Sequence, residues 1–288
     1  MYPNIENIIK RVTKSSYNSS STWKEFTQHL ETYLIYGDLD LYVVYQINPH
    51  VFIWPQNGGQ TKCQLQLLEQ DPTSIFYKTL SINDYGPRGI YLYNNIQLDR
   101  VEHVWSIYSL VHKLNFSLDK DEIIFEFGAG TGQMADVLSN LQFKGKHVIY
   151  DLPLMTVLQK YFIDKKNIPN TFILDDEPMN MITGTNFLPC NQLNREKEVV
   201  NMPNINFIAT YSLTETDIDT RNKFSDYMVH FSRIYIVYWP GKYEVGDNVD
   251  NSEYIQQLQT KLQETHYCFN DNHFVNGKVF TAVKKQLV

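Results

Sequence analysis

The sequence contains few cysteines, and their spacing excludes two classes of small scaffold. Its 288 residues include only three, Cys63, Cys190 and Cys268, which lie far apart and are odd in number. No Cys-x-x-Cys pair and no Cys/His spacing of a metal site occurs, so we expect no disulfide framework and assign no metal-binding residue, while any dependence on a metal stays open. This cysteine usage is typical of a reducing compartment, and we therefore predict a cytoplasmic location.

Positive charge is also in short supply. Lys and Arg total 25 against 32 Asp and Glu, which gives a formal net charge of -7 and a pI of about 5.6. Proteins that bind nucleic-acid backbones usually carry a basic stripe, but the basic clusters here are short, such as Lys165-Lys166 and Lys284-Lys285. We interpret both pairs as solvated surface and expect no nucleic-acid partner.

Long apolar runs are absent too. No segment approaches the roughly 20 apolar residues that a membrane-spanning helix requires. The N-terminal segment MYPNIENIIKRVTKSSYN lacks the apolar centre of a secretory signal. We therefore expect a soluble protein without a membrane partner.

From residue 121 onward, short apolar segments alternate with segments of helical periodicity. This alternation predicts a mostly parallel sheet with helices on both faces, and an antiparallel hairpin closes the chain. The predicted fold class is thus α/β, a doubly wound, Rossmann-like sheet of seven strands. The main predicted strands are EIIFEF (122–127), KHVIYD (146–151), NTFILDD (170–176), NINFIATYS (204–212) and RIYIVY (233–238).

The first part of the chain has a different pattern. Residues 23–37 and 98–116 have the apolar spacing of amphipathic helices, and turn-rich segments lie between them. We predict a mostly helical cap over 1–116 and a ligand-binding core over 117–288. Residues 179–204 are long and polar for a connection, so we expect a lid or an insertion there.

A glycine-rich loop follows the first core strand. In EFGAGTGQ the glycines are Gly128, Gly130 and Gly132, with Glu126 two positions before the first. The carboxyl ends of parallel strands are where such sheets bind ligands, and glycine lets the backbone approach a ligand closely. The spacing is not the G-x-G-x-x-G of dinucleotide folds, and no Gly-Lys-Ser/Thr of a P-loop follows. A carboxylate beside the loop suits a cationic ligand better than a diphosphate.

These residues resemble motif I of the class I S-adenosylmethionine (AdoMet) methyltransferases. The resemblance implies AdoMet as the cofactor, with the acidic residue near its methionine end and the glycines beneath it. Asp151 ends the second predicted strand, 25 positions after Glu126, where a carboxylate can accept both ribose hydroxyls. Asp175 or Asp176 can either meet the adenine or cap a helix. The predicted cofactor contacts are Glu126, Phe127, Gly128, Ala129, Gly130, Gly132, Asp151, Leu152, Asp175, Asp176, Thr210 and Tyr211.

Two further stretches resemble the sugar O-methyltransferase family. They are YDLP after the second core strand and ATYSLTET at the end of the fourth. The resemblance covers roughly residues 80–285 and departs from the family at Thr216, where Met is usual. It implies a sugar hydroxyl, in a nucleotide-sugar or a glycan, as the methyl acceptor.

A sugar hydroxyl is a poor nucleophile at neutral pH, so its methylation favours a nearby base or a bound metal. Glu215, just past the fourth strand, is the first candidate, although a helix N-terminal acid would look the same. His103, on the helix before the core, is the second. Asp84, Tyr85 and Arg88, in NDYGPRG, are candidate substrate contacts because Tyr suits a sugar face and Arg a phosphate or carboxylate.

Two alternatives remain open at this point. One is N-methylation of an amino sugar or O-methylation of another small molecule, which differs only in the acceptor pocket. The other is a non-catalytic module that binds the cofactor. A homo-oligomer is also left open, since the sequence does not determine it.

Overall fold

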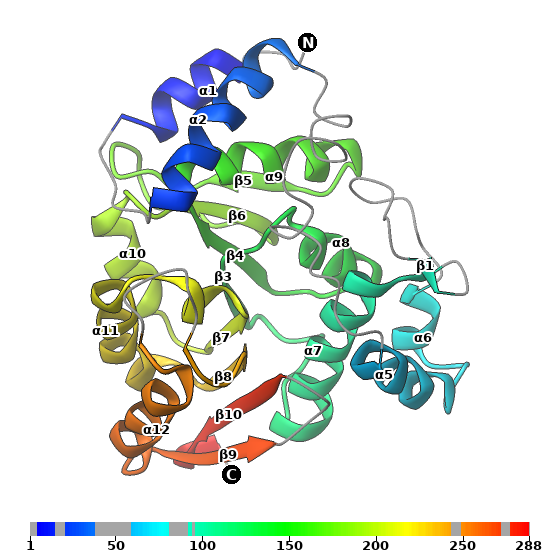
Figure 1. Cartoon of the computed structure of the whole chain (residues 1–288). Coiled ribbons are helices and arrows are strands. Elements are labelled where there is room, and N and C mark those ends of the chain that lie inside the picture. Colours follow the sequence, from blue (N-terminus) through cyan, green and yellow to red (C-terminus); the bar gives the residue numbers. More distant parts are fainter. Residues whose placement is uncertain are drawn as a thin grey trace.

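The computed structural model describes residues 5–14, 21–37, 59–80, 92–93, 96–242, 249–271 and 277–287. Within these ranges the main sheet has eight strands in the order β5-β6-β4-β3-β7-β8-β10-β9 (Figure 1). Its first six strands run parallel, and β10 is antiparallel to both β8 and β9, which confirms the predicted fold class. The strands are β3 (Ile123–Phe127), β4 (Lys146–Asp151), β5 (Asn170–Phe172), β6 (Gly184–Pro189), β7 (Ile205–Thr210), β8 (Arg233–Tyr238), β9 (His266–Asp271) and β10 (Lys278–Lys284), and a separate pair is formed by β1 (Leu92–Tyr93) and β2 (Ile96–Gln97).

The sheet has one strand more than predicted because residues 179–204 are not a lid. They contain β6, which lies between β4 and β5, and the helix α10 (Leu193–Val200). The segment looked like a connection because β6 buries polar residues. Asn186 is fully buried, and its amide bonds the backbone of Ile182, accepting from N at 2.8 Å and donating to O at 3.0 Å. A buried polar side chain that satisfies itself on nearby backbone is compatible with a core strand.

Helices cover both faces of the sheet, as a parallel sheet requires. One face packs against α10, α11 (Ile218–Tyr227) and α12 (Asn251–Leu262). The other packs against α7 (Leu98–Leu114), α8 (Gln133–Asn140) and α9 (Pro153–Lys165). Short 3-10 turns are η1 (Ser212–Glu215), η2 (Met228–His230) and η3 (Lys285–Leu287).

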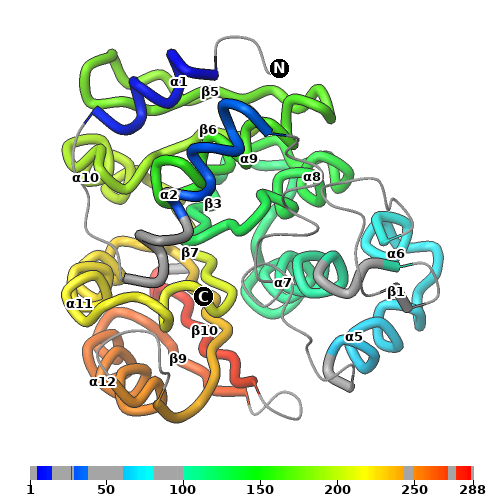
Figure 2. Tube along the Cα trace, turned by 45° about the horizontal axis from the view of Figure 1, so that its top comes forward, coloured from blue at the N-terminus to red at the C-terminus, as the bar shows by residue number. Residues whose placement is uncertain are grey.

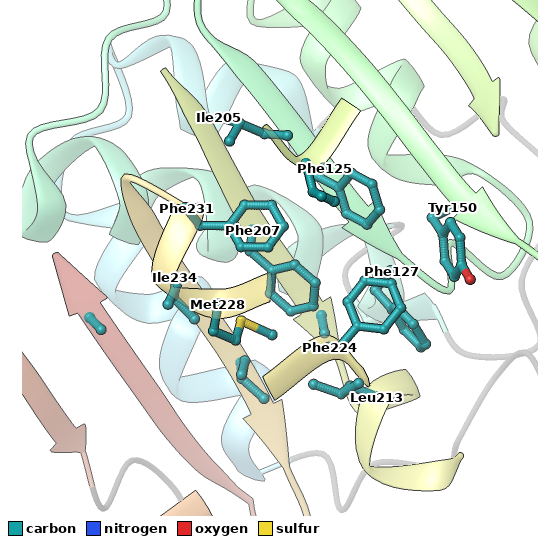
Figure 3. Packing of buried hydrophobic residues seen from close by; sticks show 14 of the residues in the cluster. Phe125, Phe127, Tyr150, Ile205, Phe207, Leu213, Phe224, Met228, Phe231 and Ile234 are labelled. Atoms are coloured by element: carbon teal, nitrogen blue, oxygen red, sulfur yellow. The ribbon is translucent and has the colours of Figure 1, made fainter. Parts of the chain in front are cut away.

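Aromatic rings fill the first of these faces. Phe125, Phe127 and Phe207 point from the strands toward Phe224 of α11 (Figure 3). The rings of Phe127 and Phe224 meet edge to face, with centroids 4.7 Å apart, a favourable aromatic geometry. This packing fixes α11, and therefore the turn η1 that precedes it, against the carboxyl ends of the strands.

The N-terminal helices lie in two separate places (Figure 2). α1 (Ile5–Val12) and α2 (Ser21–Tyr36) pack against α9, and α5 (Gly59–Glu69) and α6 (Ile75–Leu80) pack against α7. α7 itself shares a buried cluster with strands of the sheet. The domain boundary near residue 117 stays a prediction.

Candidate cofactor-binding site

The glycine loop connects β3 to α8 at the carboxyl edge of the sheet (Figure 1). β3 has β4 on one side and β7 on the other, so the loop lies where the strand order reverses, the position at which such sheets bind ligands. Gly128, Gly130 and Gly132 all have positive φ, at 68°, 54° and 83°. Side chains rarely tolerate this region, which explains the glycines.

Gly128 also lies against a neighbouring turn. A Cβ at this position would come within 2.4 Å of the Cβ of Ser212 in η1. The Ser212 hydroxyl donates to the carbonyl of Phe127, so the turn after β7 is fastened to the start of the loop. The loops that follow β3 and β7 therefore form one unit.

Asp151, at the end of β4, holds the glycine loop from the other side. Its Oδ2 accepts from the backbone N–H of Ala129 at 2.9 Å and from the side-chain amide of Gln159 at 2.7 Å. Its Oδ1 accepts from the N–H of Leu152 at 2.7 Å. Gln159 also donates to the carbonyl of Gly130 at 3.0 Å. Gln159 was not predicted, because no motif links a residue on α9 to the loop.

Loss of solvent around the Asp151 carboxylate raises its pKa to about 6, and the nearby Glu126 charge adds to the rise. Its three hydrogen bonds act in the opposite direction. Each carboxylate oxygen can accept more than one hydrogen bond, so Oδ1, with one donor, has capacity for a ribose hydroxyl.

Glu126 lies beneath the loop and is only 1% exposed. Its Oε2 is 2.8 Å from Nε2 of His147 on β4, and its Oε1 has no hydrogen-bond partner among the described residues. A buried oxygen without a donor is costly, so a donor from a water molecule or a ligand would stabilise it. His147 was not predicted, although its position two residues before Ile149, the strand partner of Glu126, places both side chains on one face.

Three of the predicted cofactor contacts, Phe127, Ala129 and Leu152, have side chains that pack in the core, so only their backbone atoms face the candidate site. The Phe127 ring belongs to the aromatic face described above, and the Ala129 methyl is buried in the cluster around α9. Leu152 packs on that same cluster and caps α9, whose first residue is Pro153. Their side chains serve packing.

Asp175 and Asp176 are engaged away from the loop. Asp175 accepts from the backbone N–H of Arg195 at 3.1 Å and thereby caps α10, the capping alternative of the sequence interpretation. Asp176 forms an exposed ion pair with Lys14. Because β6 lies beside β4, Asp151 pairs with Pro189 in the strand register, and the N–H of the following Cys190 donates to the carbonyl of Asp151 at 2.8 Å.

The end of β7 carries Thr210 and Tyr211. Thr210 is half-buried, and Tyr211 is a non-glycine residue with φ at 67°. Backbone in this region costs free energy and is concentrated at functional sites. The Tyr211 ring stacks on Trp239 at the end of β8, with centroids 4.8 Å apart and an interplanar angle of 19°.

Glu215 is the last residue of the turn η1, which begins directly after Tyr211. Burial raises its pKa from the ordinary 4.5 to about 7, and the Arg221 guanidinium partly opposes this. Its Oε1 has no hydrogen-bond partner in the part of the chain that the structure describes. Arg221, fully buried, donates to the carbonyls of Thr214 and Thr216 and so fixes the backbone on both sides of Glu215. Arg221 was not predicted, because its partners near Glu215 are backbone carbonyls and its side-chain partner, Asn251, lies 30 residues away.

The remaining predicted residues lie elsewhere. His103 is half-buried on α7, the helix that packs on α8 and β8. Asp84, Tyr85 and Arg88 lie outside the described residues. In the described ranges no group of three His, Cys, Asp or Glu side chains is arranged to hold a metal ion, and no helix there has both the length and the apolar character to cross a membrane.

No protein-family model matches this chain, and no curated protein does. Solved structures with a similar arrangement include an rRNA methylase from Streptococcus thermophilus, 10% identical with a TM-score of 0.41, the match covering 58% of this chain and 89% of the other. Another is precorrin-6y C5,15-methyltransferase from Geobacter metallireducens, which is 10% identical with a TM-score of 0.43, the match covering 72% of this chain and 99% of the other. A SAM dependent methyltransferase from Aquifex aeolicus is 13% identical with a TM-score of 0.37, the match covering 61% of this chain and 93% of the other. At these values the function has to be argued from the site.

Proposed function

We propose that this chain is an AdoMet-dependent methyltransferase. The observation that carries the proposal is the buried Oε1 of Glu126, which receives no hydrogen bond from the described residues and lies two positions before a loop of three left-handed glycines. An α-ammonium group is a hydrogen-bond donor whose charge is opposite to that of a carboxylate, whereas the carboxylate would repel a diphosphate. Asp151 supplies acceptor capacity for a ribose at the end of the adjacent strand. When bound, AdoMet supplies a methyl group on a sulfonium.

The residues at the end of β7 suit the acceptor side of such a reaction. Methyl transfer needs the acceptor held in line with the methyl group, and a hydroxyl acceptor needs a group to take its proton. A carboxyl with a pKa near 7 is well matched to that task, and Glu215 has that value. We assign Glu215 as the base that accepts the proton of the hydroxyl. His103 remains the second candidate.

The proposed acceptor is a sugar hydroxyl, supported by the YDLP and YSLTE stretches. The formal net charge of -7 disfavours a nucleic-acid acceptor. Methylation of an amino sugar is the alternative, and it depends less on a base because an amine is a better nucleophile. A location in the cytoplasm stays a prediction, and assembly into a homo-oligomer stays open.

The cofactor is tested by isothermal titration with AdoMet and with its demethylated product, S-adenosylhomocysteine (AdoHcy). We expect saturable binding of both. Absence of heat at millimolar ligand would overturn the proposal. A panel of nucleotide-sugars and free sugars is then incubated with AdoMet and read by mass for a gain of one methylene. Cofactor binding without any methylated product across O- and N-acceptors would favour the non-catalytic module.

A further inference from the structure

A buried pair of titratable side chains precedes the glycine loop, and one member of it, His147, has not been given a role. His147 and Glu126 have side chains that are 2% and 1% exposed, and Nε2 and Oε2 are 2.8 Å apart. An ionised carboxylate only accepts hydrogen bonds, so the imidazole donates from Nε2. Its Nδ1 has no hydrogen-bond partner among the described residues.

The strand register determines from which direction His147 reaches the carboxylate. In the strand register Glu126 pairs with Ile149, and Ile124 pairs with His147. The imidazole of His147 therefore lies on the same face of the sheet as Glu126, two residues closer to the amino ends of the strands. The glycine loop lies at the carboxyl ends. His147 therefore contacts Oε2 from the side away from the loop, and Oε1 is the carboxylate oxygen that has no hydrogen-bond partner among the described residues.

From this geometry we propose that His147 is a positioning residue that orients Glu126 to receive the α-ammonium group of the cofactor's amino-acid moiety. The inference rests on the proposed function and deepens it. β4 is hydrogen-bonded on both sides, to β3 and β6, so the imidazole is carried on rigid backbone. Ligand groups are held best by side chains whose own orientation is fixed in this way.

A purely structural role makes a different prediction. Replacing a buried pair by well-packed apolar groups is often neutral for stability, so the fold by itself does not require a histidine here. If His147 only fills space, its loss weakens every ligand of the site equally. If it orients Glu126, its loss weakens only ligands that carry the amino group.

The test uses the full chain and two probes. AdoHcy carries the amino acid, and 5′-methylthioadenosine shares the nucleoside and sulfur but lacks it. H147F removes the donor at similar volume, and H147Q restores a donor. We expect H147F to weaken AdoHcy about tenfold or more, the effect of losing an oriented hydrogen bond to a charged group, while 5′-methylthioadenosine changes less than about twofold. H147Q is expected to recover most of the AdoHcy affinity.

A second measurement avoids dependence on H147F folding. In uniformly ¹⁵N-labelled wild-type protein, the His147 ring resonances, assigned by their absence in H147Q, should shift with AdoHcy and stay in place with 5′-methylthioadenosine. Equal losses for the two probes, unchanged AdoHcy affinity in H147F, or identical ring shifts would overturn the positioning role. Failure of the wild type to bind either probe would instead overturn the proposed function and the inference together.

Discussion

At the scale of single residues, the ionisation of Glu215 connects activity with stability. Its folded-state pKa of about 7 is above the ordinary 4.5, so the folded protein retains a proton that the unfolded chain releases. The stability that the protonated Glu215 carboxyl contributes is present at low pH, and it is lost as the pH rises from 4.5 to about 7. We expect E215Q to be more heat-stable than the wild type at about pH 8 and to lose that advantage at about pH 5.

The same variant tests the proposed base. With a hydroxyl acceptor, E215Q should lower kcat by about 100-fold or more, in the range found for general bases. D219N, which changes an exposed acid on α11, is the matched control and should leave both properties unchanged. Full activity of E215Q would remove Glu215 from the mechanism and favour an amine acceptor.

The second prediction at the residue scale concerns the substitution of Gly128 by alanine. G128A combines a φ of 68° with a Cβ 2.4 Å from that of Ser212, so η1 or the loop must move. We expect a loss of about 1–3 kcal/mol in unfolding free energy and weaker AdoHcy binding. The control is G241A, which has a φ of 89° but no described atom within 4 Å of its Cβ. If G241A weakens AdoHcy binding as much as G128A does, the contact with Ser212 is not the cause.

At the scale of elements, α10 depends on a cap from a distant segment. Asp175 bonds the N–H of Arg195 in the first turn of the helix, so D175A should cost about 0.5–2 kcal/mol in urea unfolding. D176A, which removes only the exposed pair with Lys14, should have no measurable effect. Equal effects of the two substitutions would contradict the capping assignment.

The elements also show how far the sequence could be interpreted. Residues 123–127, 146–151, 205–210 and 233–238 are apolar enough to be recognised as strands, and the structure confirms them. β6 was missed because Thr185 and Asn186, both buried, look like loop residues in a one-dimensional pattern. Their hydrogen bonds exist only once the chain has folded.

At the scale of the whole molecule, a buried ion pair joins α6 and α7 to α8 of the core. Arg100 of α7 contacts Asp136 of α8 at 2.6 Å and the Thr79 carbonyl of α6 at 2.8 Å. Arg100 is fully buried, so R100M leaves the Asp136 charge without this partner and should cost about 3–5 kcal/mol in unfolding free energy. The double variant R100M/D136L should lose clearly less, as measured in urea. Equal losses would show that the uncompensated Asp136 charge is not the main cause of the destabilisation.

The sequence by itself determined the alternating fold, the glycine-rich turn after the first core strand and the carboxylates Glu126 and Asp151 on two neighbouring strands, because strand periodicity, glycine content and strand-end positions are local properties. Only the tertiary structure decided that β6 enters the sheet, that Asp175 caps a helix, and that His147, Gln159 and Arg221 support the site. These contacts join residues far apart in the chain, often through backbone atoms that every residue shares. Such contacts leave no local pattern in the sequence, and packing alone selects them.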